Sequence, residues 1–167
     1  MTQSDERRSP MQKITPFLWF KTEAEEAANF YVSIFKDARI LEITRNGEGG
    51  PGPADEVLVV RFQLAGMEYI ALNGRQESGF TDAVSLMVDC GSQADVDHYW
   101  EKLMAGGGAP IACGWLKDKY GFCWQVTPTI LLKYLRDKDK AKAQRVMQAM
   151  MKMVKLDIAA IEKAYKG

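Results

Sequence analysis

The sequence has little histidine, few cysteines and no excess of charge of either sign. It has one histidine, His98, in 167 residues, and its 22 basic residues balance its 22 acidic residues. Proteins that bind nucleic acid or an anionic membrane through charge present an excess of basic residues. The balance therefore argues against both kinds of partner.

Cysteine pairs and long apolar runs are missing as well. Cys90, Cys113 and Cys123 are odd in number and form no C-x-x-C pair, which argues against a disulfide framework and a structural zinc site. We expect reduced thiols in a cytoplasmic protein. No apolar run approaches the roughly 20 residues of a membrane-spanning helix. Residues 1–11 are polar and predict a flexible leader without a signal core.

The chain does contain an internal repeat, whose first module covers residues 12–74. Thr22 followed by Glu25 predicts a capping box at the start of a helix. Apolar residues at helical spacing continue that helix to Phe35. Strand patterns flank it, at Ile14–Phe20 before the helix and at Arg39–Arg45, Glu56–Leu64 and Met67–Leu72 after it.

The second module, residues 82–128, repeats this order. Ala83–Val88 predicts a strand, and Ser92 with Asp95 predicts a second helix cap. Gly106–Gly108 ends that helix, because glycine loses the most backbone entropy on ordering. Two further strands are predicted at Pro110–Leu116 and Phe122–Thr127, joined by a turn that places Lys117 and Asp118 at the hairpin surface.

Two segments lie outside the strands and helices of the modules. Asn46–Ala54 is rich in glycine and proline and predicts a mobile, solvated connector rather than a substrate lid. Residues 129–167 predict three amphipathic helices: Ile130–Leu135, a second from Asp139 to about Val154, and a third after Asp157. Such helices need an apolar surface, on the same chain or on a second subunit.

Four segments carry a resemblance to a known family: ITPFLWF, EEAANFYVSIF, ALNG and CGWLKDKYGFCWQVTP. With the repeat, they resemble the vicinal-oxygen-chelate superfamily of glyoxalase I, bleomycin-resistance proteins and extradiol dioxygenases. Within it the chain looks like the PhnB-like family, also labelled 3-demethylubiquinone-9 3-methyltransferase-like. The resemblance implies an α+β fold of two tandem βαβββ modules, an incomplete eight-stranded barrel and a C-terminal helical tail. It also implies a homodimer, and a concave sheet face that forms a cup for a small ligand or a divalent metal.

Metal-using relatives place histidine, glutamine or glutamate on the first and last strands of each module. The corresponding positions here are Thr15 or Pro16, Ala71, Ala83 and Gln125. Alanine and proline cannot ligate a metal, and His98 lies on a predicted helix. We therefore expect no metal site of the superfamily type and no cofactor.

The methyltransferase label implies a different site. Common S-adenosylmethionine enzymes need a glycine-rich turn that leads from a strand into a helix. Asn46–Gly50 precedes a predicted strand and Gly106–Gly108 follows a predicted helix. Neither run therefore has the required context.

Five side chains are candidates to line the cup and bind a small, flat or oxygenated ligand. Asn73 could instead support the turn at Gly74, and the tryptophans could be core. The core interpretation is preferred for Trp100 and Trp124. With no histidine nearby, the cysteine among the candidates is not expected to be a nucleophile. The candidates are Trp19, Asn73, Trp115, Cys123 and Gln125.

Three functions remain open on this evidence. The preferred one is metal-free binding of a small molecule, with partners limited to that ligand and a second copy of the chain. The alternative is an enzyme of the lyase, dioxygenase or transferase type that acts on a small oxygenated substrate with a weakly bound divalent metal. A third is an interaction role in which the tail from Thr129 holds a dimer together.

Overall fold

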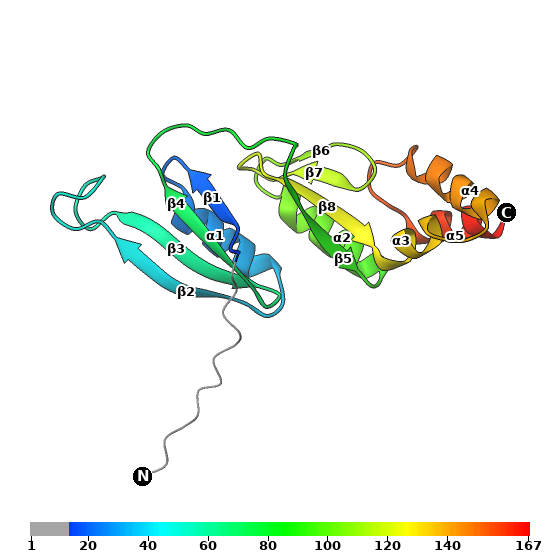
Figure 1. The fold of residues 1–167 in the computed structure, drawn as a ribbon, viewed down its shortest axis with the longest axis horizontal. Helices are drawn as coiled ribbons and strands as arrows, with labels where there is room; N and C mark the ends of the chain where they lie inside the picture. The colour runs from blue at the N-terminus through cyan, green and yellow to red at the C-terminus, as the bar shows by residue number, and fades with distance from the viewer. Residues whose placement is uncertain (1–13) are drawn as a thin grey trace, which may run out of the picture. The chain divides into compact units, whose positions relative to one another are not determined.

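The computed structural model describes residues 14–167, so the expected leader lies outside the described part of the chain. The chain divides into two compact units, one ending at Ser78 and the other running from Gly79 to Gly167. The first contains β1 (Phe17–Phe20), α1 (Ala24–Ile34), β2 (Ala38–Arg45), β3 (Val57–Leu64) and β4 (Met67–Asn73). Figure 1 shows α1 lying across one side of this sheet.

The second unit repeats the order of the first and adds the tail. Its module contains β5 (Ser85–Cys90), α2 (Gln93–Met104), β6 (Ala109–Pro110), β7 (Trp115–Lys117) and β8 (Cys123–Pro128). The tail contains α3 (Thr129–Leu135), α4 (Lys140–Met150) and α5 (Ile158–Lys166), drawn in yellow to red in Figure 1.

The two sheets have the same topology. Their strand orders are β1-β4-β3-β2 and β5-β8-β7-β6. In each, the first and last strands of the module pair in parallel and the remaining neighbours are antiparallel. The predicted α+β fold of two tandem βαβββ modules is confirmed, with the eight strands divided between two four-stranded sheets.

One face of each sheet packs against a helix. In the first sheet Val60, Phe62 and Ala71 are fully buried, and Phe62 stacks on Tyr31 of α1 with ring centroids 6.2 Å apart. In the second sheet the corresponding face carries Trp124, and the predicted core position of this tryptophan is confirmed, with 2% exposed. Since side chains alternate along a strand, the opposite face of each sheet is fixed by the same register.

Those opposite faces are called here the first and second open faces. The first consists of Phe17, Trp19, Arg39, Glu42, Thr44, Val59, Arg61, Gln63, Glu68, Ile70 and Leu72. The second consists of Ser85, Met87, Asp89, Ala109, Trp115, Lys117, Cys123, Gln125 and Thr127.

The predicted capping box at α1 is wrong. The helix starts at Ala24, and no side chain of the preceding residue caps it. Asn73, at the end of β4, supplies the acceptor instead, because its Oδ1 accepts from the Ala24 N–H at 2.8 Å. The second predicted cap is confirmed, since Ser92 Oγ accepts from the Asp95 N–H at 3.1 Å.

The predicted strand at Pro110–Leu116 is wrong in its middle. Cys113 and Gly114 adopt positive φ of 54° and 84° and separate β6 from β7. Their N–H groups donate to the Met153 and Val154 carbonyls at 2.8 Å each. The two N–H groups are therefore paired with the C-terminal tail, while the Gly114 carbonyl accepts from the Val126 N–H of β8 at 2.8 Å.

The tail packs on its own chain. Its buried cluster consists of Leu131, Val146, Leu156 and Ile161. Gln93 of α2 ties the tail to the module, since its Oε1 accepts from the Ile158 N–H at 2.8 Å and its Nε2 donates to the Leu156 carbonyl at 3.3 Å. The second tail helix ends at Met150 and not near Val154 as predicted. No helix among residues 14–167 is long and apolar enough to cross a membrane.

Candidate functional site

Three of the five candidate residues lie together on the second open face. Trp115 of β7 pairs in register with Gln125 of β8, and Cys123 lies two residues before Gln125 on the same strand. Trp115 and Gln125 are half-buried, whereas Cys123 is fully buried. The Gln125 amide donates to Ser85 Oγ at 2.8 Å, which fixes its orientation on this face.

Cys123 contacts an ion pair between Lys117 and Asp82. Lys117 Nζ lies 2.8 Å from Asp82 Oδ1, and the Cys123 thiol donates to the same oxygen at 3.3 Å. The hydrogen bond from Lys117 lowers the pKa of Asp82. Burial first, and then the hydrogen bond to Asp82, raise the pKa of Cys123. The thiol is therefore protonated at neutral pH and is not arranged as a nucleophile.

Trp19 lies on the first open face, in the other unit. It pairs in register with Leu72 and is 39% exposed. Its indole N–H donates to the Gln76 carbonyl at 3.2 Å. Phe17, two residues earlier on the same face, is 55% exposed. Two large aromatic side chains therefore face outward from β1.

Asn73 does not share an open face with the other candidates. Besides accepting from Ala24, its amide donates to the Val57 carbonyl at 2.9 Å. Both the oxygen and the nitrogen of the side-chain amide are thus hydrogen-bonded, and they join α1, β3 and β4. Asn73 is therefore not included in the proposed site.

The observed strand register does not place the predicted metal-equivalent residues on the open faces of the first and last strands, apart from Gln125. Ala71 is fully buried on the face that packs against α1, and Ala83 lies before β5, so neither is an open-face position of a first or last strand. Thr15 and Pro16 lie before β1. The central open-face positions where first and last strands pair are Phe17, Ile70, Met87 and Gln125.

Those residues do not fit a divalent metal. Three of the four are apolar, and a glutamine oxygen is a single neutral donor. Among residues 14–167, no group of three or more His, Cys, Asp or Glu side chains is arranged to hold a metal ion. His98 lies on α2, as predicted, and is exposed.

The hairpin between β7 and β8 differs from the prediction in the burial of Asp118. Asp118 was expected at the surface, but it is 2% exposed. Its carboxylate accepts from the backbone N–H groups of Tyr120 and Phe122 and from the Trp124 indole. Asp118 therefore organises the turn, and only Lys117 faces the second open face.

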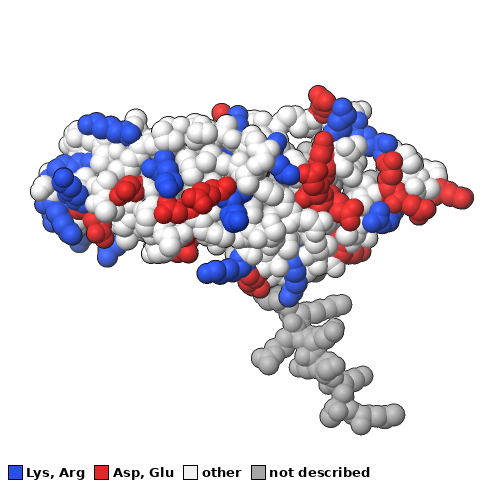
Figure 2. Space-filling view, turned by 180° about the vertical axis from the view of Figure 1, so that it is seen from behind, with Lys and Arg blue, Asp and Glu red and all other residues white. Residues whose placement is uncertain are grey.

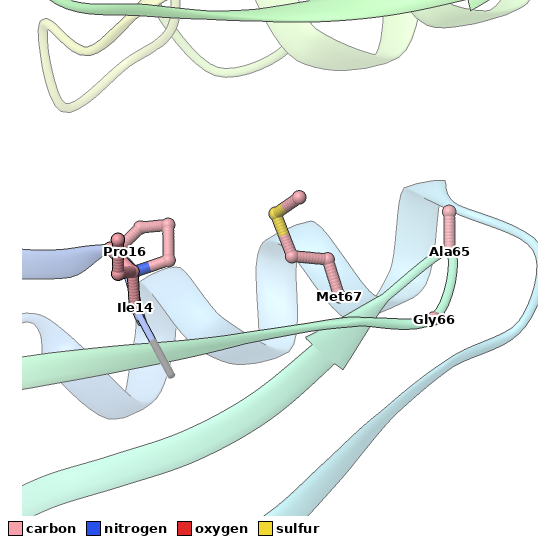
Figure 3. A pocket seen from close by; sticks show the side chains of 5 residues that line it. All are labelled: Ile14, Pro16, Ala65, Gly66 and Met67. Atoms are coloured by element: carbon pink, nitrogen blue, oxygen red, sulfur yellow. The ribbon is translucent and has the colours of Figure 1, made fainter. Parts of the chain in front are cut away.

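A pocket of about 630 Å³ lies elsewhere, at the turn between β3 and β4. Figure 3 shows its lining by Ile14, Pro16, Ala65, Gly66 and Met67. None of these side chains is polar, and Ile14 is 86% exposed. The pocket offers no groups that orient a ligand, so it is not the candidate site.

Charge does not single out a surface either. Figure 2 shows acidic and basic side chains interspersed over the face that it draws. In the first unit, for example, Lys21 pairs with Glu77 and Arg75 pairs with Glu56, so these charges neutralise one another. The candidate site therefore depends on the strand register and not on a large charged patch.

Comparison with family models shows to which protein family the chain belongs. A model described as 3-demethylubiquinone-9 3-methyltransferase matches residues 12–127. The chain belongs to this family. The match covers both modules and ends just before the tail, so family membership rests on the repeat described above.

Solved structures related to this 3-demethylubiquinone-9 3-methyltransferase family member agree. The PhnB protein of Bacillus cereus is 38% identical over 71% of this chain and 100% of its own, with a TM-score of 0.64. Protein PA1353 of Pseudomonas aeruginosa is 18% identical over 71% and 98%, with a TM-score of 0.58. Fosfomycin resistance protein FosX of Mesorhizobium loti is 15% identical over 74% and 99%, with a TM-score of 0.50. The last two show the fold alone. No curated protein matches the chain.

The family's name refers to methyl transfer, and the positions of the two glycine runs in the fold bear on that activity. The glycine run at Gly47–Gly50 joins β2 to β3, and Gly106–Gly108 joins α2 to β6. Neither leads from a strand into a helix, which is the geometry of the common S-adenosylmethionine site. The absence of that context, predicted from sequence, is confirmed for both runs.

Proposed function

We propose that this protein binds a small molecule on the open faces of its two sheets, without a metal of the superfamily type. The observation that carries the proposal is the registered pair Trp115 and Gln125 on the second open face. An indole ring beside an oriented amide can stack on a flat ligand and hydrogen-bond its oxygen or nitrogen atoms. Methyl transfer is not part of the proposal, because neither glycine run has the required context.

The test is a binding screen of aromatic and oxygenated metabolites, read by thermal shift and confirmed by calorimetry. We expect a hit whose affinity falls at least tenfold in Trp115→Leu and in Gln125→Leu. Gln148→Leu is the matched control, because Gln148 is an exposed glutamine on α4 of the tail and is not a residue of either open face. Hits that bind equally well to all three variants would overturn the placement of the site. An empty screen would count against binding itself.

We also propose that the functional form is a homodimer and that the protein works in the cytoplasm. Three cysteines without disulfide partners support the second point. Because the buried apolar side chains of the tail helices pack against one another, we do not assign the dimer contact to the tail. Light scattering of the full chain should give twice the mass of the monomer; a monomer at micromolar concentration would contradict the dimer.

A further inference from the structure

Gln125 lies in the middle of the second open face. Its strand, β8, runs between β5 and β7, as Figure 1 shows. Its partner on β5 is Met87, which is 50% exposed, and its partner on the antiparallel strand β7 is the half-buried Trp115. Residues directly opposed on antiparallel strands have Cβ atoms about 5 Å apart. A small molecule that contacts the Gln125 amide can therefore contact the indole ring as well.

The hydrogen-bonding capacity of Gln125 is only partly used. A side-chain amide has two N–H donors and one carbonyl acceptor. One N–H donates to Ser85 Oγ at 2.8 Å. Among residues 14–167, no other group is hydrogen-bonded to this amide. The carbonyl oxygen and the second N–H are thus available to a ligand, and the bond to Ser85 fixes where they lie.

Ser85 supplies a further donor beside the amide. A hydroxyl has one O–H donor and also accepts through its lone pairs. Because Ser85 Oγ accepts from Gln125, its own proton remains to be donated to a ligand. The strand partner of Ser85 is Cys123, whose thiol is already hydrogen-bonded to Asp82. An acceptor and a donor therefore lie side by side, within reach of one edge of a small ligand.

Charge contributes little to recognition at this position. The charged residues of the second open face are Lys117 and Asp89. Lys117 Nζ lies 2.8 Å from Asp82 Oδ1, and Asp89 accepts from the Thr129 hydroxyl at 2.9 Å. The cation of this face is thus engaged by a carboxylate and offers no free charge to an anionic ligand. Recognition falls to the amide, the hydroxyl and the indole ring.

We propose that the ligand bound at Trp115 and Gln125 is a flat ring with a cyclic amide edge, in which an N–H lies beside a C=O. The N–H donates to Gln125 Oε1, the C=O accepts from the Ser85 hydroxyl or from the second amide N–H, and the ring stacks on the indole. A ketone, ester or carboxylate supplies acceptors alone and leaves Oε1 without a donor. The inference rests on the proposed function and names the class of its ligand.

The test uses four probes. They are 2-pyridone, which has the flat ring and the amide edge; 1-methyl-2-pyridone, which lacks the N–H; 2-piperidone, which keeps the edge but not the flat ring; and benzoate, a flat anion. The readout is the ¹⁵N–¹H signal of the Trp115 indole, assigned by its loss in Trp115→Phe. We expect 2-pyridone to shift this signal saturably and to bind at least about fivefold more tightly than each other probe, the scale of one net hydrogen bond or one aromatic contact.

Variants of the two polar residues test their roles. Gln125→Leu removes the acceptor, so the preference for 2-pyridone over 1-methyl-2-pyridone should fall below about twofold. Ser85→Ala removes the hydroxyl and releases the amide, and it should weaken 2-pyridone at least about threefold. Ser78→Ala is its matched control and should bind like the parent, because Ser78 is an exposed serine outside both open faces. Thermal unfolding shows whether each variant is folded; if Gln125→Leu is not, the probe series on the parent and on Ser85→Ala decides the question.

The outcomes separate this inference from the proposed function. Equal binding of 2-pyridone and 1-methyl-2-pyridone, or tighter binding of benzoate, would overturn the cyclic amide class and leave small-molecule binding intact. If no probe shifts the Trp115 signal, the inference is wrong, whereas the metabolite screen with Trp115→Leu still tests the proposed function independently. A preference for 2-pyridone that persists in Gln125→Leu would show that Gln125 is not the acceptor.

Discussion

The indole N–H of Trp124 donates to the carboxylate of Asp118 at 2.8 Å, and both side chains are buried. The other carboxylate oxygen accepts from the Tyr120 and Phe122 N–H groups at 2.9 and 3.0 Å. A buried charge is tolerated when it is fully hydrogen-bonded. Here the charge joins the β7–β8 turn to the core of the second module.

The first prediction concerns this network. Asp118→Ala removes the acceptor of three N–H groups, two of them buried, and should lower the free energy of unfolding by about 3 kcal/mol. Asp118→Asn keeps one oxygen acceptor and should cost less, about 1 kcal/mol. Urea unfolding measures both. Equal losses for the two variants would contradict the view that the carboxylate acts as an acceptor.

The second prediction concerns the start of α1. Asn73→Ala removes the bonds to Ala24 and Val57 and should cost about 1–2 kcal/mol, the usual scale for losing a helix cap. Thr22→Ala should change stability by less than about 0.5 kcal/mol, because Thr22 is exposed and its side chain caps nothing. Chemical denaturation of the pair is decisive, and a larger loss for Thr22→Ala would restore the capping box.

The third prediction concerns the contact between the tail and the second module. A Cβ at Gly114 would lie 2.8 Å from Leu156 Cδ1 and 2.9 Å from the Val126 carbonyl oxygen. Gly114→Ala should therefore cost more than about 2 kcal/mol and increase hydrogen exchange in α5.

Gly121→Ala is the matched control for that experiment. Its φ of 83° is close to the 84° of Gly114, but a Cβ at Gly121 would meet nothing within 4 Å. Gly121→Ala should lower the free energy of unfolding only by the cost of a positive φ for alanine, about 1 kcal/mol. Similar losses at the two sites would mean that the overlap with the tail contributes little.

The fourth prediction concerns alkaline pH. Burial, and then the neighbouring Asp95 and Asp89 carboxylates, raise the pKa of Cys90 from its ordinary value of 9.0 to about 12. The folded state therefore favours the neutral thiol. That contribution to stability is complete below about pH 9 and is lost as the pH rises toward 12.

Cys90→Ala tests this dependence. Between pH 8 and 10.5 its stability should decline less steeply than that of the parent, once both are referred to their values at pH 8. Cys113→Ala controls for the loss of a thiol at a partly exposed position. Parallel pH profiles for the parent and Cys90→Ala would show that Cys90 is not the source of the decline.

Sequence predicted the second open face better than the first. Alternation along Phe122–Thr127 places Gln125 on the opposite side from Trp124, and the structure has this arrangement. The same reasoning misplaced the metal-equivalent residue on β4, because the strand register was uncertain by one residue. A shift of one residue exchanges the two faces of a strand, and Ala71 lies on the buried one.

The long-range contacts could not be predicted from local patterns. Asn73 is 49 residues from Ala24, and Gly114 meets a tail residue 42 positions later only because the chain folds back on itself. Similarly, Trp19 has no local signal that distinguishes a core indole from one held against Gly74.

The amino-acid sequence by itself determined the tandem βαβββ order, the three tail helices and the shortage of metal ligands, since these depend on local periodicity, caps and residue type. Only the tertiary structure decided which residue caps α1, where the tail packs and which side chains share an open face. Those features depend on strand register and on backbone hydrogen bonds between segments far apart in the chain.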